Sequence, residues 1–552
     1  MRKKVFLTFL SILFTIIIVI GNSFYVSDSF KFIEKNIIIN LIIAIISLAV
    51  FYLIFSKIFE ILEHKEFKIL DKLNKSKIIN KIKKTKLYKL FLKHPFLFSL
   101  IFILICWLPY IISFYPSILS PDPSFQIKQY FKIPNKYSTY VVLLDPNVLI
   151  TNHHPVIHTL LLGTCVKIGK IINNVNLGFF IYSLIQTLIL SSVLAYTIKF
   201  MNDLKLSKKY LLFSLVIYSF VPIFPFYAMS AVKDVIFGSL IILYIITIYK
   251  LIKCDDIKIK NIVKIIILLI LIILFRNNGI HVIVLSFPFL FFIDKKIRKK
   301  IKLILIFLVI IIFNYSYNNI ILPYFKITPT SVREMLSIPF QQTARYVKYH
   351  DREVTKEEKK AIDKLLNYDT LAKRYKSDIS DPVKNEFNRY YKKEDLNKYF
   401  RVWFKEFTKH PITYIEATID NTYGYFYPLK TRWFIYYKYY DKVVEDGFDY
   451  HYNDLKESRK FLSYYGVSFP YIPVIGLIVN IAFNVWILIF MLVYLIYKKK
   501  YKSAIYLIPS YVLILVCIAS PVNAYFRYAL PYVFALMLNL GIFIKEGVID
   551  ER

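Results

Sequence analysis

Residues 37–55 read IIINLIIAIISLAVFYLIF, nineteen residues without one charged side chain, and they decide the class of this protein. About 20 apolar residues in a helix cross the hydrocarbon core of a bilayer. Residues 303–313, LILIFLVIIIF, repeat the pattern far along the chain. Over all 552 residues, 57% are hydrophobic and the mean hydropathy is +0.49. This composition excludes an ordinary soluble enzyme and a disordered chain, and it predicts an all-α polytopic membrane protein.

The charge balance is strongly basic, with 73 Lys and Arg against 37 Asp and Glu and a formal net charge of +36. In a soluble protein this balance, with 46 Tyr and 48 Phe available for stacking, would favour nucleic-acid binding. The apolar runs argue against that interpretation, so membrane lipid is the expected partner and nucleic acid is not. The four cysteines show no spacing typical of a disulfide framework or a zinc site.

Hydropathy predicts twelve membrane helices, and the Lys and Arg of short loops set their direction, because such loops stay in the cytoplasm. Arg2, Lys3 and Lys4 place the N-terminus inside, and the loop 57–93 carries 12 Lys against 4 acidic residues. Both termini are therefore expected on the cytoplasmic side of the cell membrane. The predicted spans are 5–21, 37–58, 95–114, 178–199, 210–230, 235–251, 262–276, 279–293, 301–323, 470–497, 504–520 and 528–545.

Residues 155–172, PVIHTLLLGTCVKIGKII, are long enough to cross, but a crossing there would turn the later basic loops outward. As an amphipathic helix along the outer interface, the segment leaves all of those loops inside. The chain then divides into two N-terminal spans with a basic loop (1–94), a membrane core (95–323), an outer domain (324–469) and three C-terminal spans (470–552). The core includes a large outer loop at 115–154.

The segment 324–469 holds 27 basic and 21 acidic residues, a balance typical of a folded polar domain. Thr355 and Glu358 form a capping-box pattern that opens a helix. A second amphipathic helix is predicted from Glu394 to Lys409, where His410-Pro411 ends it. The sequence therefore predicts a mainly helical extracytoplasmic domain.

Polar and charged residues gather in the loops that this topology places outside, and charge at a helix end in a membrane protein is a candidate for function. Taken singly, each has a structural alternative: a hairpin cap, an arginine reaching lipid headgroups, a packed histidine or a turn residue. Together, five such loops at one membrane face indicate an active site. The candidates are Asp122, Gln126 and Gln129 in the loop 115–154; His153, His154 and His158 at the interfacial helix; Lys233 and Asp234; Arg276, Asn277 and Asn278; and Arg527 with Tyr528.

The chemistry suited to such a site is group transfer from a polyprenyl-phosphate sugar, whose reactive carbon lies at headgroup depth. Asp122 is the candidate catalytic base for the attacking hydroxyl. Lys233, Arg276 and Arg527 are the candidate phosphate ligands, since arginine offers a bidentate fork. The proposed chemistry requires no metal or other cofactor, although the question of a divalent cation between Asp122 and Asp234 stays open.

The segments YPSILSPDPSFQ, with its Asp122, and NHHPVIHTLLLGTCVKIG resemble GT-C-type membrane glycosyltransferases, which include protein O-mannosyltransferases and lipid A aminoarabinose transferases. The resemblance implies a GT-C-like fold in which the second segment lies along the outer surface. Asp122 stands between two prolines, whereas the mannosyltransferases carry a neighbouring acid, so the resemblance does not identify the donor.

Seven segments between about residues 115 and 531 resemble, more closely, a functionally uncharacterised bacterial family of multi-pass proteins. They include AVKDVIFG, FRNNGI, NAYFRYALPY and SIPFQQTARYV, and the last adds Gln341, Gln342 and Arg345 as substrate-binding candidates.

The function expected from these observations is transfer of a sugar from a polyprenyl-phosphate donor to a cell-surface acceptor, on the outer face of the membrane. A transporter or flippase of lipid-linked glycans is the first alternative, but transporters commonly place polar groups at the bilayer midplane in two related halves. A non-catalytic membrane scaffold is the second. The sugar, the acceptor and the oligomeric state stay open.

Overall fold

The structure is a computed structural model that describes residues 1–63, 85–293, 296–431, 448 and 450–549. The middle of the predicted basic loop 57–93 therefore lies outside the described residues. Within them the chain forms helices and isolated β-bridges but no strand. This confirms the all-α class.

Eight helices in the described part of the chain are long and apolar enough to cross a membrane, which confirms a polytopic membrane architecture. All eight correspond to predicted spans. They are α1 (Arg2–Ser27), α3 (Ile37–Glu63), α7 (Pro95–Ser113), α10 (Val175–Asp203), α13 (Lys233–Lys253), α17 with α18 (Ile297–Tyr324), α27 with α28 (Tyr501–Ile518) and α29 with the helices after it (Phe526–Ile549).

The other four predicted spans are bent or shorter, so the structure does not confirm twelve. Segment 210–230 forms α11 (Lys208–Phe220) and α12 (Ile223–Met229), bent by 48°. Helix α14 (Ile259–Phe275) has 17 residues, and 279–293 is divided into α15 (Gly279–Ser286) and α16 (Phe289–Ile293).

The predicted span 470–497 begins eleven residues too early, because α26 is Ile481–Tyr497. The residues before it form two short 3₁₀ turns, Phe469–Tyr471 and Ile475–Val479. Pro470 and Pro473 lie in this stretch, and proline lacks the N–H that an α-helix requires. Hydropathy alone does not detect that interruption.

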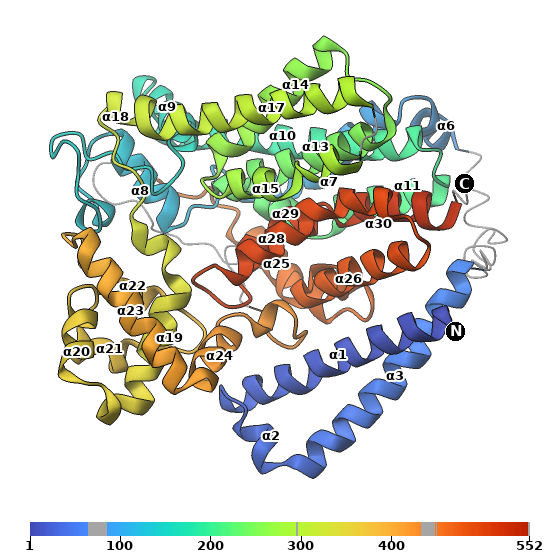
Figure 1. The fold of residues 1–552 in the computed structure, drawn as a ribbon. Helices are drawn as coiled ribbons and strands as arrows, with labels where there is room; N and C mark the ends of the chain where they lie inside the picture. Colours follow the sequence, from blue (N-terminus) through green and yellow to red (C-terminus); the bar gives the residue numbers. More distant parts are fainter. Residues whose placement is uncertain (64–84, 294–295, 432–447, 449, 550–552) are drawn as a thin grey trace.

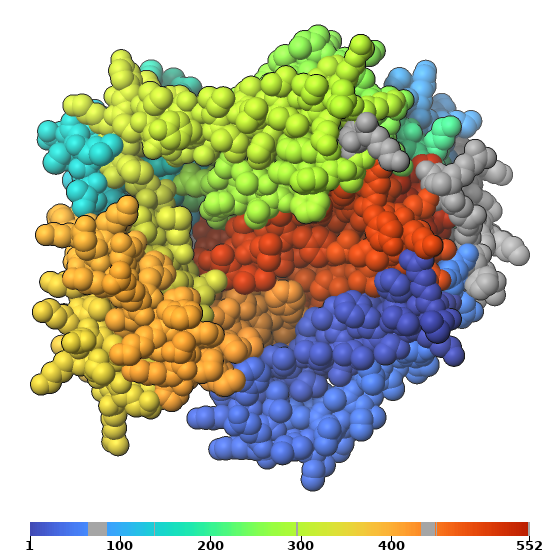
Figure 2. All heavy atoms as spheres, in the orientation of Figure 1, coloured from blue at the N-terminus to red at the C-terminus, as the bar shows by residue number. Residues whose placement is uncertain are grey.

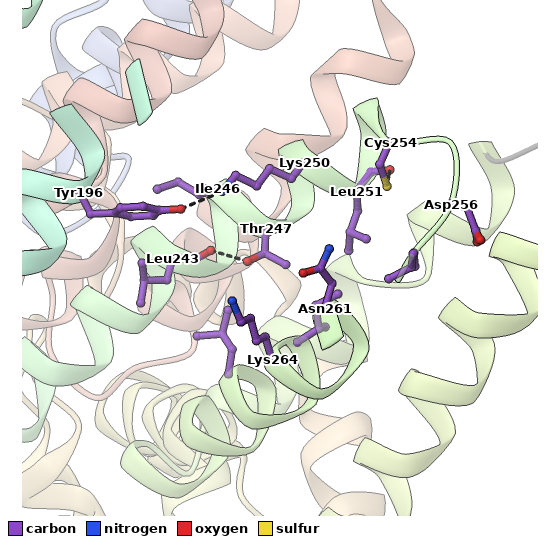
Figure 3. Close-up of a pocket in the computed structure, with 13 residues that line it drawn as sticks. Tyr196, Leu243, Ile246, Thr247, Lys250, Leu251, Cys254, Asp256, Asn261 and Lys264 are labelled. Carbon is purple, nitrogen blue, oxygen red and sulfur yellow. Dashed lines mark hydrogen bonds between the residues drawn. The ribbon is translucent and has the colours of Figure 1, made fainter. Parts of the chain in front are cut away.

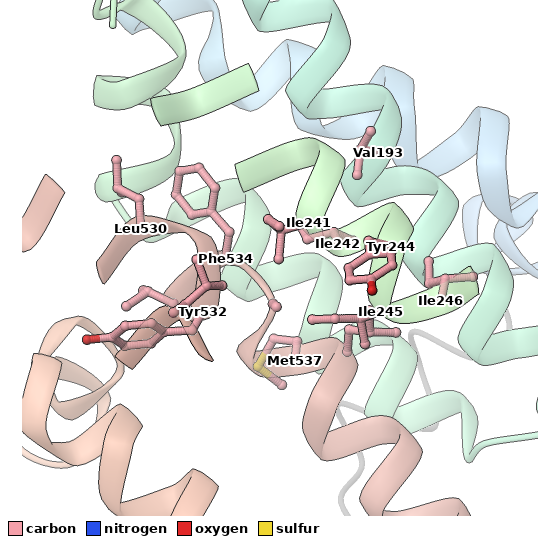
Figure 4. Close-up of a cluster of buried hydrophobic side chains, with 14 of the residues drawn as sticks. Val193, Ile241, Ile242, Tyr244, Ile245, Ile246, Leu530, Tyr532, Phe534 and Met537 are labelled. Atoms are coloured by element: carbon pink, nitrogen blue, oxygen red, sulfur yellow. The ribbon is translucent and has the colours of Figure 1, made fainter. Parts of the chain in front are cut away.

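The centre of the bundle is α13. In its most apolar stretch 83% of the residues are buried, against 6% in the corresponding stretch of α3. Figure 4 shows Ile241 and Ile245 of α13 beside Phe534 and Met537 of the C-terminal helices. All four side chains are at least 97% buried. The last membrane helices therefore pack on the sixth predicted span, far away in sequence.

Both chain termini lie at one end of the bundle, and a separate helical domain lies at the opposite end (Figure 1). We call these the terminal end and the domain end. Helices α8 (Pro121–Tyr130) and α9 (Val156–Ile171) lie at the domain end. Helix α9 has only 16 residues and is not among the eight long membrane helices. Its predicted place along the membrane surface stays a prediction.

The helical domain has a hydrophobic core of its own, formed around Phe340, Val347, Leu366 and Tyr399. The capping box of Thr355 and Glu358 is present, and the helix predicted to end at Lys409 does end there. The elements are α19 (Ser337–His350), α20 (Lys356–Asp363), α21 (Tyr368–Arg374), α22 (Asp381–Lys384), α23 (Lys393–Lys409) and α24 (Pro411–Asp420).

The last part of the predicted domain packs elsewhere. Helix α25 (Lys456–Ser468) lies against α7 of the bundle. The Arg459 guanidinium donates a 2.9 Å hydrogen bond to the Ser113 carbonyl at the end of α7. Residues 456–468 thus belong structurally to the membrane bundle.

Candidate functional site

Isolated backbone bridges hold the loops of the domain end together. The Ile118 N–H donates to the Met229 carbonyl at 2.8 Å, and the Ala231 N–H donates back to the Ile118 carbonyl at 3.0 Å. This pairing ties the start of α8 to the start of α13. It is the reason that Asp122 and Asp234, 112 positions apart, belong to one site.

A second bridge joins Thr151 to Thr328, with a 2.7 Å bond from the Asn152 N–H to the Thr328 carbonyl. A third joins Ile379 of the helical domain to Val522, just before α29. The domain is therefore fixed to the same loops that carry the candidate residues.

Two carboxylates and two arginines form the centre of the site. The Arg527 guanidinium donates a 2.7 Å hydrogen bond to Asp122 Oδ2, and its Nε lies 3.4 Å from Asp234 Oδ2. The Arg276 guanidinium forms an ion pair with the other oxygen of Asp234. Asp234 is fully buried, while the side chain of Asp122 is 22% exposed. The buried carboxylate of Asp234 thus holds both arginines in place, and Asp122 is the carboxylate that solvent or a ligand can reach.

Aromatic rings flank these arginines. The Arg276 guanidinium lies 5.5 Å from the centre of the Phe237 ring and 5.6 Å from that of Tyr528. The Arg527 guanidinium lies 5.5 Å from the rings of both Tyr525 and Tyr528. Cation–π contacts at such distances stabilise buried guanidinium groups. Tyr528, one of the predicted site residues, thus lies beside both arginines.

Arg276, Asn277 and Asn278 form the turn between α14 and α15, as predicted. Gly279 follows, and a side chain there would clash with the Ile272 carbonyl, 2.3 Å from a built Cβ. The Asn277 amide donates to the Asn152 carbonyl at 2.6 Å, so this turn contacts the loop before α9. Asn278 caps α15 without a side-chain hydrogen bond at that cap.

Lys233 and the adjacent histidines extend the site. The Lys233 ammonium lies 2.8 Å from His154 Nδ1 and donates to it. His153 Nδ1 lies 3.9 Å from a Glu334 oxygen. Burial, reinforced by Lys233, lowers the pKa of His153 to about 4 despite Glu334, and burial lowers the pKa of His154 well below its ordinary value. Both imidazoles are therefore neutral at neutral pH.

The ionisation of Asp122 reflects two opposed effects. Burial raises the pKa of the carboxyl, but the charges of Arg527 and Lys233 and the hydrogen bond from Arg527 outweigh it and hold the pKa well below 3.8. Three basic side chains, Lys233, Arg276 and Arg527, thus lie beside two carboxylates and two neutral histidines. Basic side chains outnumber carboxylates here, a composition that suits an anionic ligand better than a divalent cation.

His158 and Gln126 belong to a buried hydrogen-bonded chain beside the site. The Tyr182 hydroxyl donates to Gln186 Oε1 at 2.9 Å and lies 2.6 Å from His158 Nε2, which donates to it. The Gln126 amide then donates to His158 Nδ1 at 2.8 Å. Burial lowers the pKa of His158 to about 3. This hydrogen-bonded chain holds α8 against α9 and α10. The contacts of His158 are therefore those of a packed histidine, which is the structural alternative considered for it from the sequence.

Several buried polar atoms near the site have no hydrogen-bond partner among the described residues. They are Ser120 Oγ, Gln129 Nε2 and Asn152 Oδ1. Gln129 is otherwise held by its Oε1, which accepts a 3.3 Å bond from the Thr151 N–H. Buried polar groups are nearly always satisfied, so these atoms are candidates for contact with a ligand.

Gln341, Gln342 and Arg345 contact other parts of the helical domain. The Gln341 amide donates to the Lys376 carbonyl at 2.8 Å, and the Gln342 amide donates to the Thr418 hydroxyl at 2.9 Å. Arg345 binds Asp420 and Glu416 of α24 and the Asp28 carbonyl after α1. The structure therefore places these three residues in the framework of the domain and in its junction with α1.

Glu334 is the residue that the sequence prediction missed. It accepts a 2.6 Å bond from Lys384, and although burial raises its pKa, Lys384 and His153 bring the value down to about 2. Its signal is weak, because it lies in the polar segment TSVREM, where an acidic residue is ordinary.

A pocket of about 490 Å³ lies away from this site, between α13 and α14 near their terminal-end loop (Figure 3). Its walls combine leucine and isoleucine side chains with polar ones, among them Lys250 and Lys264. Asp256, also in the lining, pairs with Lys302 at 2.8 Å. The pocket lacks the carboxylate–arginine grouping of the domain end.

The sequence profile of a family of unknown function, DUF6020, matches residues 3–548, and the chain belongs to this family. No curated protein and no solved structure matches the chain.

Proposed function

We propose that this member of the family is a GT-C-type glycosyltransferase that moves a sugar from a polyprenyl-phosphate donor to a cell-surface acceptor. One observation carries the proposal: Asp122, a partly exposed carboxylate, lies among Lys233, Arg276 and Arg527 at the ends of membrane helices. An anion site and a proton acceptor at one membrane boundary are what transfer from a lipid phosphate requires.

The proposed orientation places the domain end outside. The terminal end carries basic loops such as 199–209 and 250–264, and short basic loops stay in the cytoplasm. The bent pair α11–α12, helix α14, the pair α15–α16 and α26 complete the twelve proposed spans beside the eight long helices. The helical domain then covers the site from the outside.

The donor phosphate enters as an anion attracted by the basic side chains, which outnumber the carboxylates of the site. Arg527 presents a planar fork that fits two phosphate oxygens, and Lys233 supplies a point charge. On the face drawn in Figure 2, the red C-terminal helices are recessed between the green helices and the yellow and orange domain. This hollow adjoins the domain end and is the proposed approach to the site.

In the proposed reaction, the acceptor hydroxyl attacks the anomeric carbon as the bond between that carbon and the phosphate oxygen breaks. The bonding electrons leave with the polyprenyl phosphate, and the hydroxyl proton passes to Asp122. While Arg527 is bound to Asp122, the low pKa of this carboxyl makes it a weak base, because a general base works best with a pKa near the operating pH. Transfer of Arg527 from Asp122 to the phosphate raises that pKa, so donor binding itself activates the base.

The test uses purified full-length protein in lipid vesicles with a panel of radiolabelled polyprenyl-phosphate sugars. Transfer, or release of polyprenyl phosphate, should be lowered about 10²–10⁴-fold by Asp122→Asn, the usual share of a general base. Asp145→Asn is the matched control, because Asp145 pairs with Lys326 in the same loop region and its Asn variant can keep the turn.

Equal loss in both variants, or full activity of Asp122→Asn, would contradict the assignment. Movement of labelled lipid across the vesicle without release of polyprenyl phosphate would instead identify a flippase. Absence of donor binding across the panel would favour the scaffold.

A further inference from the structure

Two histidines and a glutamate form a compact cluster in the helical domain, apart from the carboxylate–arginine site. His350 ends α19, Glu353 lies in the 3₁₀ turn after it, and His410 separates α23 from α24. One ligand atom from each of the three lies within 4.8 Å of the other two. The cluster therefore joins the end of α19, the turn after it and the residue between α23 and α24.

The nitrogen–oxygen distances lie within about 1 Å of the spacing of zinc ligands. His350 Nδ1 lies 3.4 Å from one Glu353 oxygen, and His410 Nε2 lies 2.8 Å from the other. Zinc binds such atoms at about 2.0–2.1 Å, so tetrahedral geometry sets neighbouring ligand atoms about 3.3 Å apart. Rotamer shifts of about 1 Å would close the site around an ion.

The surroundings orient the histidines. His350 Nε2 lies 2.9 Å from the Thr413 hydroxyl, a contact that leaves Nδ1 for a ligand. The two imidazole rings stack with centres 3.7 Å apart, and the Tyr346 ring lies beside both. A hydrogen bond on the second nitrogen is how proteins commonly fix a metal-binding imidazole.

We propose that His350, Glu353 and His410 form a Zn²⁺ site in the helical domain. Nitrogen with carboxylate oxygen is a donor set that zinc accepts. The Glu353 side chain is 52% exposed, so an ion can enter from solvent and keep water in its fourth position. The ion would tie the end of α19 to the α23–α24 corner. Because α19 also carries Arg345, it would stiffen the junction of the domain with α1.

The test uses the full-length protein with a purification tag that lacks histidine, stripped with a chelator and then given Zn²⁺ alone. Bound zinc is measured by elemental analysis and by calorimetry. One Zn²⁺ per chain is expected, absent in His350→Ala and His410→Ala. Glu353→Gln, a conservative change at an exposed position, should weaken binding strongly. Thr413→Val should weaken it about 10–100-fold, the usual effect of losing an orienting hydrogen bond.

His451→Ala is the matched control, because His451 is exposed and lies outside the cluster. Zinc should also raise the thermal unfolding temperature of the wild type and of this control, but not of Glu353→Gln. No bound zinc, or equal binding by wild type and Glu353→Gln, would overturn the site. The outcome is independent of sugar transfer.

Discussion

Replacement of Asp234 by Asn tests the centre of the site without any assumption about activity. The side chain keeps its shape but loses the charge that both arginines share. Arg527 keeps its 2.7 Å contact with Asp122. Arg276 forms its ion pair with Asp234 and with no other carboxylate in the described part of the chain, so the variant leaves it buried and uncompensated.

The expected cost follows from the distances and burial. Two unit charges 3.4 Å apart, the distance from Arg527 to Asp234, attract by about 5 kcal/mol at an effective dielectric constant of about 20. Measured losses on breaking one partner of a buried pair are about 3–5 kcal/mol. We expect Asp234→Asn to lower the free energy of unfolding by about 3–5 kcal/mol.

The assay is denaturant unfolding in mixed micelles, followed by tryptophan fluorescence. Asp145→Asn is the control and should change stability by less than about 0.5 kcal/mol, as surface substitutions commonly do. The double variant Asp234→Asn/Arg276→Gln removes both charges and should recover most of the loss, since replacing a whole buried pair is often neutral. A single variant within about 1 kcal/mol of wild type, or a double variant less stable than the single one, would refute the pairing.

Three further outcomes are expected. Arg527→Lys keeps the charge but loses the fork, so donor-phosphate binding should fall at least about tenfold in a vesicle-binding assay, and unchanged binding would remove this role. In a background without Cys106 and Cys254, Lys356→Cys should react with an impermeant thiol reagent in intact cells and Lys258→Cys should not; the reverse pattern would invert the proposed topology. Burial raises the pKa of Glu406 from 4.5 to about 8 although Tyr414 opposes this, so the folded state binds the extra proton. Stability should then fall as pH rises from 4.5 to 8, and Glu406→Gln should flatten this slope; an identical slope would show that Glu406 is not the cause.

Hydropathy predicts the membrane helices well because the apolar stretches are long and uncharged, and α1, α3, α7, α10 and α13 lie where the sequence places them. It fails where apolar residues do not form a helix. Residues 470–480 are apolar enough to be included in a predicted span. Their prolines interrupt the helix, and the chain turns at Val474, whose φ is 65°. A hydropathy average contains no information on backbone conformation.

The membership of the site was partly predictable because polar residues at the ends of membrane helices are few. The contacts that these residues make with one another were not predictable. Asp122 and Arg527 are 405 positions apart, and the bridge from Ile118 to the segment before α13 has no sequence signature. Arg345 shows a second limit of the sequence. The resemblance of the segment SIPFQQTARYV made it a substrate candidate, and the sequence does not show that Asp420 and Glu416 in a later helix form ion pairs with it.

The ion pairs of the site also change the roles expected for Lys233, Arg276 and Arg527. In the sequence they read as three phosphate ligands, but Asp122 and Asp234 compensate Arg527 and Arg276. Lys233 is left facing a neutral histidine, without a carboxylate in ion-pair contact among the described residues. In the proposed reaction, a phosphate must therefore compete with Asp122 for Arg527, and its binding frees the Asp122 carboxylate to accept a proton. We propose that this one competition explains both a low affinity of the resting protein for anions and a base that becomes active only in the complex. It would keep Asp122 from deprotonating hydroxyls when no donor is bound.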